Sequence, residues 1–292
     1  MDIPGAARIK VAALQMEPSF GDKEWNIAES CRLIDIAAAE GAVLMVLPEL
    51  CNTGYVFESK VEALSLAERV PGGPTTDAWI GKARQHQAYI CAGITELAGT
   101  LLFNSVAVVG PEGYIGTYRK MHLWDRERLW FEPGNLGFPV FELPFGTIGC
   151  RICYDVWFPE STRILALQGA DIICDSTNWV DSPPIQSKTK PIAAVSASQM
   201  SLMNSVFSIC ADRVGSDRSG TELGTVFIGN SCIIDPQGDY VAGPASADSL
   251  EVLIAAIDLA KSREKDRTPH NNTFGDRRVD WYGNLLGYGS AR

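Results

Sequence analysis

Three polar residues stand at the ends of apolar, strand-like segments and could together perform nucleophilic chemistry. They are Glu49, Lys120 and Cys153. Polar residues at the carboxyl ends of strands in α/β proteins tend to meet at one edge of the sheet. A thiol is a nucleophile, a carboxylate can accept its proton, and an ammonium group can stabilise a developing negative charge. These residue types therefore fit covalent catalysis on a polarised carbon atom.

Cys153 has the most informative position of the three. A strand expected over 147–152 leads directly into it, and a helix is expected to begin near Pro159. A turn from strand to helix holds a side chain at the sheet edge, close to backbone N–H groups that can bind an oxyanion. The nearby start of a helix also favours the thiolate. From position alone, a nucleophile and a buried structural cysteine remain alternatives.

Glu49 and Lys120 have a functional and a structural interpretation. A carboxylate delivered by a buried strand enters a region of low dielectric constant, so the pKa of Glu49 should rise toward the range of a general base. Arg119 and Lys120 point to opposite sides of a strand, so one of them must face the interior and needs a carboxylate partner there. The alternatives are a solvated strand-end glutamate and a solvated basic pair.

Other chemistries fit the sequence less well. Cys150 and Cys153 have the C-x-x-C spacing of a redox pair or half a zinc site, but the other cysteines are scattered singly and Cys150 lies inside a strand. None of the three histidines stands at a comparable strand end. The sequence lacks the phosphate-binding, dinucleotide-binding and serine-hydrolase motifs. We therefore expect no metal ion and no cofactor.

Composition restricts the partners and the compartment. The chain has 292 residues, of which 46% are hydrophobic, and a formal net charge of -10. Nucleic acids and anionic membranes bind basic surfaces, so we expect neither as a partner. No apolar run approaches the roughly 20 residues of a membrane span. The N-terminus lacks the basic and apolar regions of a signal peptide, which predicts a cytoplasmic protein with reduced cysteines.

Strand-like and helix-like segments alternate along the chain. The expected helices are 26–40, 74–86, 158–168 and 193–204. The expected strands are 9–14, 42–47, 89–94, 101–109, 114–119, 140–143, 147–152, 172–175, 206–211, 229–234, 238–241 and 253–257. Both crossover and hairpin connections occur, which predicts an α/β fold with mixed sheets covered by helices in a single domain over 1–292. The polar tail from about 260 to 292 should lie over the surface or contact a partner subunit.

Taken together, the three strand ends resemble the nitrilase, or carbon–nitrogen hydrolase, superfamily. Residues 47–49 are similar to its glutamate motif, 118–123 to its lysine motif, and 149–160 to its cysteine motif. Further similar segments are 12–15, 103–105 and 131–134. Single motifs are weak evidence, but three in the right order are strong. The resemblance implies an α-β-β-α sandwich and a Glu49–Lys120–Cys153 triad.

The resemblance also implies roles for residues around this triad. Glu127 corresponds to a second glutamate that positions the lysine or the substrate, although an exposed helix glutamate is the alternative. The backbone N–H of Tyr154 would join Lys120 in stabilising an oxyanion. Asn178 and Trp179 would line the substrate pocket, with a plain loop as the alternative. The sequence departs from the family at Asp212, where many members have asparagine, so local hydrogen bonding can differ there.

The implied activity is hydrolysis of a non-peptide C–N bond of a small amide or N-carbamoyl compound, through a thioester on the cysteine. The sequence Cys153-Tyr154-Asp155 is similar to amidases, whereas many nitrilases carry Cys-Trp-Glu. Conversion of a nitrile is the first alternative, and a non-catalytic scaffold, as in family members that have lost the triad, is the second. The likeness further implies a homodimer or a higher homo-oligomer.

Overall fold

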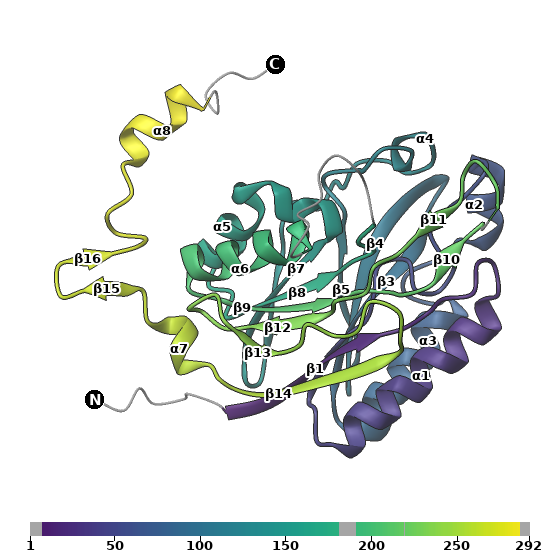
Figure 1. The fold of residues 1–292 in the computed structure, drawn as a ribbon, viewed down its shortest axis with the longest axis horizontal. Coiled ribbons are helices and arrows are strands. Elements are labelled where there is room, and N and C mark those ends of the chain that lie inside the picture. Colours follow the sequence, from purple (N-terminus) through teal and green to yellow (C-terminus); the bar gives the residue numbers. More distant parts are fainter. Residues whose placement is uncertain (1–7, 181–190, 219, 287–292) are drawn as a thin grey trace.

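Two six-stranded mixed sheets pack face to face and are covered by helices on their outer sides (Figure 1). The computed structural model describes residues 8–180, 191–218 and 220–286. The predicted α-β-β-α sandwich is confirmed. The expectation about a signal peptide concerns residues 1–7, which lie outside the described residues, as do the last six residues of the tail.

The first sheet has the strand order β14-β1-β2-β3-β4-β5. Its strands are β1 Arg8–Gln15, β2 Leu44–Val46, β3 Tyr89–Ala98, β4 Leu101–Gly110, β5 Gly113–Arg119 and β14 Glu251–Asp258. Strands β1, β2 and β3 are parallel, and β4 and β5 follow as antiparallel hairpins. Helices α1 Lys23–Ala39 and α3 Pro74–His86 cover its outer face (Figure 1).

The second sheet has the strand order β13-β12-β9-β8-β7-β6. Its strands are β6 Val140–Leu143, β7 Gly146–Ile152, β8 Ile172–Ser176, β9 Phe207–Ala211, β12 Cys232–Ile234 and β13 Tyr240–Ala242. Strands β7, β8 and β9 are parallel, so their carboxyl ends lie at one edge. Helices α5 Pro159–Leu167 and α6 Ile192–Asn204 cover this sheet on the other side of the molecule (Figure 1).

The main apolar core lies between the two sheets. It contains branched side chains such as Val46 and Val106 from the first sheet and Ile148, Ile172 and Ile209 from the second, all of them fully buried. Such strands are covered on both faces, so they appear in the sequence as continuous apolar runs. The core therefore fixes the two sheets against each other and sets the positions at which their strands end.

Several short elements lie outside the predicted set. They are α2 Lys60–Leu66, α4 Glu127–Trp130, a 3-10 helix Cys153–Trp157, α7 Ala260–Arg263, α8 Val279–Leu285, the hairpin β10 Ser216–Asp217 with β11 Thr225–Val226, and the hairpin β15 Asp266–Thr268 with β16 Asn271–Asn272. The last hairpin is attached to the end of α6, where Arg267 donates to Leu202 O and Ser205 Oγ, and α8 extends beyond it (Figure 1). The described part of the tail is therefore an arm that is fixed at its base. Contact of this arm with a partner subunit stays a prediction.

None of the helices in the described parts of the chain is both long enough and apolar enough to cross a lipid bilayer.

Candidate active site

The predicted site residues follow strands from both sheets. Glu49 comes after β2, Lys120 directly after β5, Cys153 directly after β7, and Asn178 shortly after β8. Hydrogen bonds join the two sheets at this point, because Glu49 N donates to Thr177 O at 3.3 Å and Asn178 Nδ2 donates to Glu49 O at 3.0 Å. The structure thus brings the ends of four strands to one place.

Lys120 lies between two carboxylates in the interior. Its Nζ donates to Glu49 Oε1 and to Glu127 Oε1, each at 2.6 Å, and all three side chains are almost completely buried. Burial opposes the charge on Lys120, but Glu127 and Glu49 outweigh it and raise the pKa of Lys120 above its ordinary value. The group is therefore an ammonium ion at every physiological pH, and the prediction that a carboxylate partner meets it is confirmed.

Glu49 has one oxygen occupied and one available. Oε1 accepts hydrogen bonds from Lys120 and, at 2.6 Å, from Asn104 Nδ2. Within the described part of the chain, Oε2 is buried and has no hydrogen-bond partner. Burial raises the pKa of Glu49 to about 7, with the charge of Glu127 adding to the effect and Lys120 opposing it. A carboxyl group in this state can both accept and return a proton near neutral pH.

Cys153 begins the 3-10 helix with a strained backbone. Its φ is +43°, a left-handed value that is costly for a residue with a side chain and is common at active sites. Burial and the charge of Glu49 raise the pKa of the Cys153 thiol well above its ordinary value, although Lys120 and the backbone N–H of Asn178 partly offset them. The expectation that the helix start favours the thiolate is therefore wrong. The resting group is a thiol, which needs a base.

Glu127 is held by three donors. Besides Lys120, Tyr55 Oη donates to Oε1 at 2.5 Å and Trp124 N donates to Oε2 at 3.3 Å. Glu127 is 4% exposed, so the alternative of an exposed helix glutamate is wrong. Tyr55 escaped the sequence analysis. Its position only six residues after Glu49, in the same connecting loop, is the signal that could have found it.

Asp155 ties the lysine segment to the nucleophile segment. Its two oxygens accept four hydrogen bonds, from Tyr118 Oη at 2.6 Å, Ile152 N at 2.9 Å, His122 Nδ1 at 2.7 Å and His122 N at 3.1 Å. Four donors match the capacity of one carboxylate. The side chain therefore fixes the turn that begins at Cys153 relative to the strand end that carries the lysine.

Asn178 and Trp179 lie beside the nucleophile and are buried. Asn178 Nδ2 donates to Glu49 O, its backbone N–H lowers the pKa of the Cys153 thiol, and its Oδ1 has no partner within the described part of the chain. The ring of Trp179 packs in an apolar cluster with Val156 and Cys153. A plain, solvated loop is therefore excluded, and contact of either side chain with a substrate stays a prediction.

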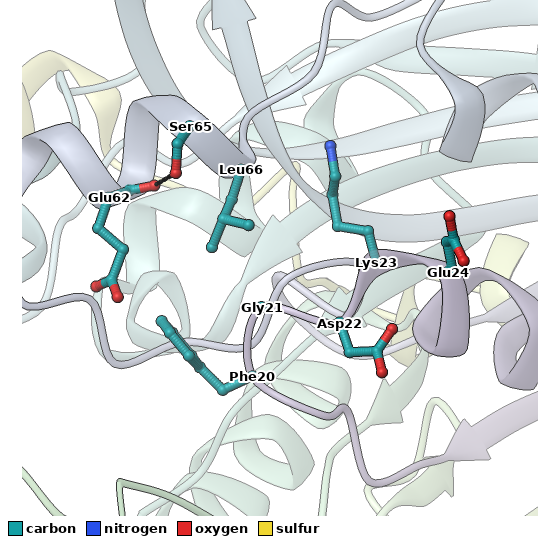
Figure 2. Close-up of a pocket in the computed structure, with 8 residues that line it drawn as sticks. All are labelled: Phe20, Gly21, Asp22, Lys23, Glu24, Glu62, Ser65 and Leu66. Carbon is teal, nitrogen blue, oxygen red and sulfur yellow. Dashed lines mark hydrogen bonds between the residues drawn. The ribbon is translucent and has the colours of Figure 1, made fainter.

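A cavity of about 510 Å³ adjoins Glu127 and Tyr55. Aromatic side chains contribute to its wall, namely Phe57, Trp124 and Trp130, and the segment 222–226 closes another side. A larger, open hollow of about 720 Å³ lies where α1 and α2 begin, between Phe20, Lys23 and Glu62 (Figure 2). It contains none of the predicted site residues. The first cavity reaches the site at Glu127, whereas Glu49, Lys120 and Cys153 do not line it.

Two glycines allow close contact with the backbone of the acid and the lysine. A Cβ atom on Gly93 would lie 2.3 Å from Pro48 O and 2.5 Å from Glu49 Cα. A Cβ atom on Gly134 would lie 2.1 Å from Arg119 O. Both glycines also donate backbone hydrogen bonds to these segments, Gly93 to Pro48 O at 3.1 Å and Gly134 to Lys120 O at 2.8 Å. They therefore set the positions of Glu49 and Lys120.

Comparison with known proteins gives consistent results over nearly the whole chain. The carbon-nitrogen hydrolase family model matches residues 10–267. A protein named nitrilase from Pyrococcus abyssi (strain GE5 / Orsay) is 44% identical over 94% of this chain and 99% of its own length. An N-carbamoylputrescine amidase from Solanum lycopersicum is 34% identical over 95% of each chain. The crystal structure of a carbon-nitrogen hydrolase from Helicobacter pylori G27 is 27% identical, with a TM-score of 0.84 over 96% of this chain and 99% of that chain.

Replacement of Gly93 or Gly134 by alanine should displace the acid or the lysine without unfolding the sandwich. The main chain must move, because the added Cβ atom would collide with rigid backbone. Glu49 would then no longer be aligned to accept the thiol proton, so alkylation of Cys153 by iodoacetamide should slow roughly tenfold or more. The measurement is the rate of modification of the peptide that contains Cys153, followed by mass spectrometry.

Gly81→Ala is the matched control for this experiment. Gly81 lies in α3, and a Cβ atom added there would meet nothing within 4 Å, so alanine should leave the alkylation rate unchanged and stabilise the helix by up to about 1 kcal/mol. Equal alkylation rates in all three variants would show that the close backbone contacts do not position the site.

Proposed function

The chain belongs to the carbon–nitrogen hydrolase family, and we propose that it hydrolyses small amides or N-carbamoyl compounds through a thioester on Cys153. It is an amidase-type enzyme acting on non-peptide C–N bonds. The observation that carries the proposed mechanism is the buried group of Glu49, Lys120 and Glu127 beside a protonated thiol. Such a group supplies a base and a fixed positive charge.

In the first half of the reaction, Glu49 accepts the proton of the Cys153 thiol, and the sulfur attacks the carbonyl carbon. Lys120 and the backbone N–H of Tyr154 stabilise the oxyanion of the tetrahedral intermediate. When the C–N bond breaks, Glu49 returns the proton to the leaving nitrogen. Ammonia departs and the acyl group remains on sulfur. The ammonium ion is already positioned before the reaction begins, because Glu49 and Glu127 hold it by hydrogen bonds of 2.6 Å.

In the second half, Glu49 accepts a proton from water, and the resulting hydroxide attacks the thioester carbon. The C–S bond breaks, the carboxylic acid leaves, and the proton returns from Glu49 to the Cys153 sulfur. The same carboxyl group thus acts in both halves. The raised pKa of Glu49 suits this alternation, because a base works best when its pKa lies near the working pH.

The preferred substrate is an amide or N-carbamoyl compound, and a nitrile is the alternative. The amide proposal is supported by Cys153-Tyr154-Asp155 after β7 and by the N-carbamoylputrescine amidase relatives. The nitrile alternative is supported by the 44% identical relative that is named nitrilase. The complete set of Glu49, Lys120, Glu127 and Cys153 argues against a scaffold without activity.

Ammonia release from matched substrates tests the reaction class. An aliphatic amide, an N-carbamoyl amine and the nitrile of the same carbon chain are compared at equal concentration. We expect turnover of the amide or the carbamoyl compound, with a mass increase of Cys153 equal to the acyl group during turnover. Cys153→Ala should reduce turnover by roughly 10⁴-fold or more, because the nucleophile is lost.

Three outcomes would contradict parts of this proposal. Faster conversion of the nitrile than of its amide would replace the amidase assignment. Full ammonia release by Cys153→Ala would exclude the thioester. An unmodified Cys153 with no ammonia from any substrate would favour the scaffold.

The dependence of activity on pH tests the role of Glu49. Because burial raises the pKa of this carboxyl group to about 7, kcat/KM should increase with pH up to about 7 and fall by about tenfold per unit below it. Glu49→Gln should remove the activity and, with it, the fall in kcat/KM below about pH 7. A profile that is flat from pH 5 to about 7 would show that Glu49 is not the base.

A homodimer, or a higher homo-oligomer, formed through the α5 and α6 face is also proposed. Ile164, Leu167 and Met203 are 39, 43 and 48% exposed, and Arg163 Nη2 donates to Met203 O, so the two helices present one apolar surface. A cytoplasmic location stays a prediction from the sequence.

Sedimentation velocity tests this interface. The native chain should sediment as a dimer or larger species, and Ile164→Asp should shift it toward the monomer, because a charge buried in an apolar interface is costly. Val61→Asp is the control, since Val61 is 76% exposed on α2, away from this face. A native chain that sediments as a monomer would contradict the proposal.

A further inference from the structure

Asp212 is a buried carboxyl group that the proposed mechanism does not use. It follows β9 directly and is 0% exposed. One oxygen, Oδ1, accepts three hydrogen bonds, from Trp179 N at 2.8 Å, Arg213 N at 2.9 Å and Thr177 Oγ1 at 3.1 Å. The other oxygen, Oδ2, is buried and has no hydrogen-bond partner in the parts of the chain that the structure describes.

No cation is committed to this carboxyl group in the described parts of the chain. The guanidinium of the next residue, Arg213, pairs instead with Asp217 through two contacts of 3.0 and 3.1 Å and lies over the ring of Phe227. The other segments that bond to Asp212 are 177–179 and Ser231, and these contain no ionisable side chain. An ionised Asp212 would be a buried charge with one oxygen atom that lacks any hydrogen-bond partner, which is strongly unfavourable.

The electrostatic environment also favours the neutral form of Asp212. Burial raises the pKa of Asp212 well above its ordinary value, and the three donors together with Arg213 offset the effect only in part. A neutral acid avoids the cost of burying an unpaired charge.

The segment that Asp212 holds is the one beside the nucleophile. Thr177 and Trp179 flank Asn178, whose backbone N–H lowers the pKa of the nearby Cys153 thiol and whose side chain donates to Glu49 O. Two of the three hydrogen bonds to Oδ1 therefore fix the residues on either side of Asn178. Because Oδ2 is buried as well, Asp212 is shielded from the cavity and acts through its neighbours.

We propose that Asp212 is a positioning residue that stays a neutral carboxylic acid in the folded protein and holds the 177–179 segment against Cys153. A protonated carboxyl group has the shape and neutrality of an amide. This explains how aspartate can occupy the position where the family resemblance places asparagine. The proposal does not depend on which substrate is hydrolysed.

The unfolding equilibrium measured against pH tests the protonation state. The folded protein keeps the Asp212 proton where the unfolded chain has lost it, so unfolding releases one proton and stability falls as pH rises above the ordinary aspartate value. The ratio of unfolding constants, wild type over Asp212→Asn, should increase up to about tenfold per pH unit between about pH 4.5 and 6.5. Titration of Glu49 occurs in both proteins and cancels in the ratio.

Asp217→Asn is the matched control from the same loop. It removes the charged partner of Arg213 and should destabilise the protein throughout the same pH range, whereas Asp212→Asn should not. A ratio for Asp212→Asn that is independent of pH would overturn the neutral acid. The neutral acid would also be overturned if Asp212→Asn destabilised the protein as much as Asp217→Asn does. That result would show that Asp212 carries the negative charge that Arg213 needs.

Alkylation of Cys153 by iodoacetamide against pH tests the positioning role and needs no substrate. Asp212→Asn should leave both the rate and its pH profile unchanged, because a neutral group replaces a neutral group. Asp212→Ala should slow the reaction, since the three hydrogen bonds are lost. A profile shifted to lower pH in Asp212→Asn would reveal a negative charge on Asp212 and overturn the proposal.

An alkylation rate of folded Asp212→Ala equal to that of the wild type would overturn the positioning role. If Asp212→Ala fails to fold, the Asp212→Asn measurements still decide the protonation state, and Thr177→Val, which removes one donor to Oδ1, replaces it as the test of positioning. None of these measurements uses turnover. The proposal for Asp212 can therefore be overturned while the hydrolase proposal stands, and the hydrolase proposal can be overturned while the proposal for Asp212 stands.

Discussion

The buried ammonium of Lys120 between two carboxylates is the interaction on which the site depends. Three charged groups lie in the interior, and each is tolerated only because the others are present. Loss of Lys120 would leave two carboxylates facing each other, and loss of either carboxylate would leave the ammonium with one partner. The arrangement has a net negative charge before the thiol is counted. Burial, with this negative charge adding to it, raises the pKa values of Glu49 and Cys153, so Glu49 can hold a proton near neutral pH and Cys153 stays a thiol.

The backbone around these charged groups is strained in some places and in others lies unusually close to a neighbouring segment. Leu50 and Cys153 have φ values of +46° and +43°, and both are next to or part of the reacting groups. Gly93 and Gly134 permit contacts that no other residue allows. Strain of this kind persists only where the surrounding structure fixes it. The inter-sheet core supplies that fixation for Glu49 and Cys153, because β2, β8 and the end of β7 are buried on both faces.

Much of the fold can be predicted from the sequence because local signals agree with global packing. The predicted bounds of helix α3 are correct to the residue, since Pro74 suits a first helical position and the pattern stops at His86. The strand predicted over 42–47 is longer than the observed β2, which covers Leu44–Val46. An apolar run indicates which residues are buried, but it does not indicate which of them form hydrogen bonds with the neighbouring strand. Helix α2 escapes prediction, since it has seven residues and buries Ala63 alone among its side chains.

Contacts between distant residues cannot be predicted in the same way. The hydrogen bond from Tyr55 to Glu127 joins positions 72 residues apart, and no local pattern records it. The motif resemblance places Glu127 near the site, but its burial and its two partners on different segments are properties of the folded chain. The helix start after Cys153 predicts the wrong protonation state, because desolvation and the neighbouring Glu49 act on the same thiol more strongly.

Sequence alone also leaves the state of each carboxyl group undecided, and this limit has a physical cause. Glu49, Glu127, Asp212 and Asp217 are all acidic, all nearly fully buried and all within one small region of contacts. Asp217 has a cation of its own in Arg213, and Glu127 shares Lys120 with Glu49 but has two further donors in Tyr55 and Trp124. Glu49 shares its cation and keeps one oxygen free, whereas Asp212 has three donors but no committed cation among the described residues. The number and charge of the partners, and not the residue type, therefore separate a base from a fixed counter-ion and from a neutral acid.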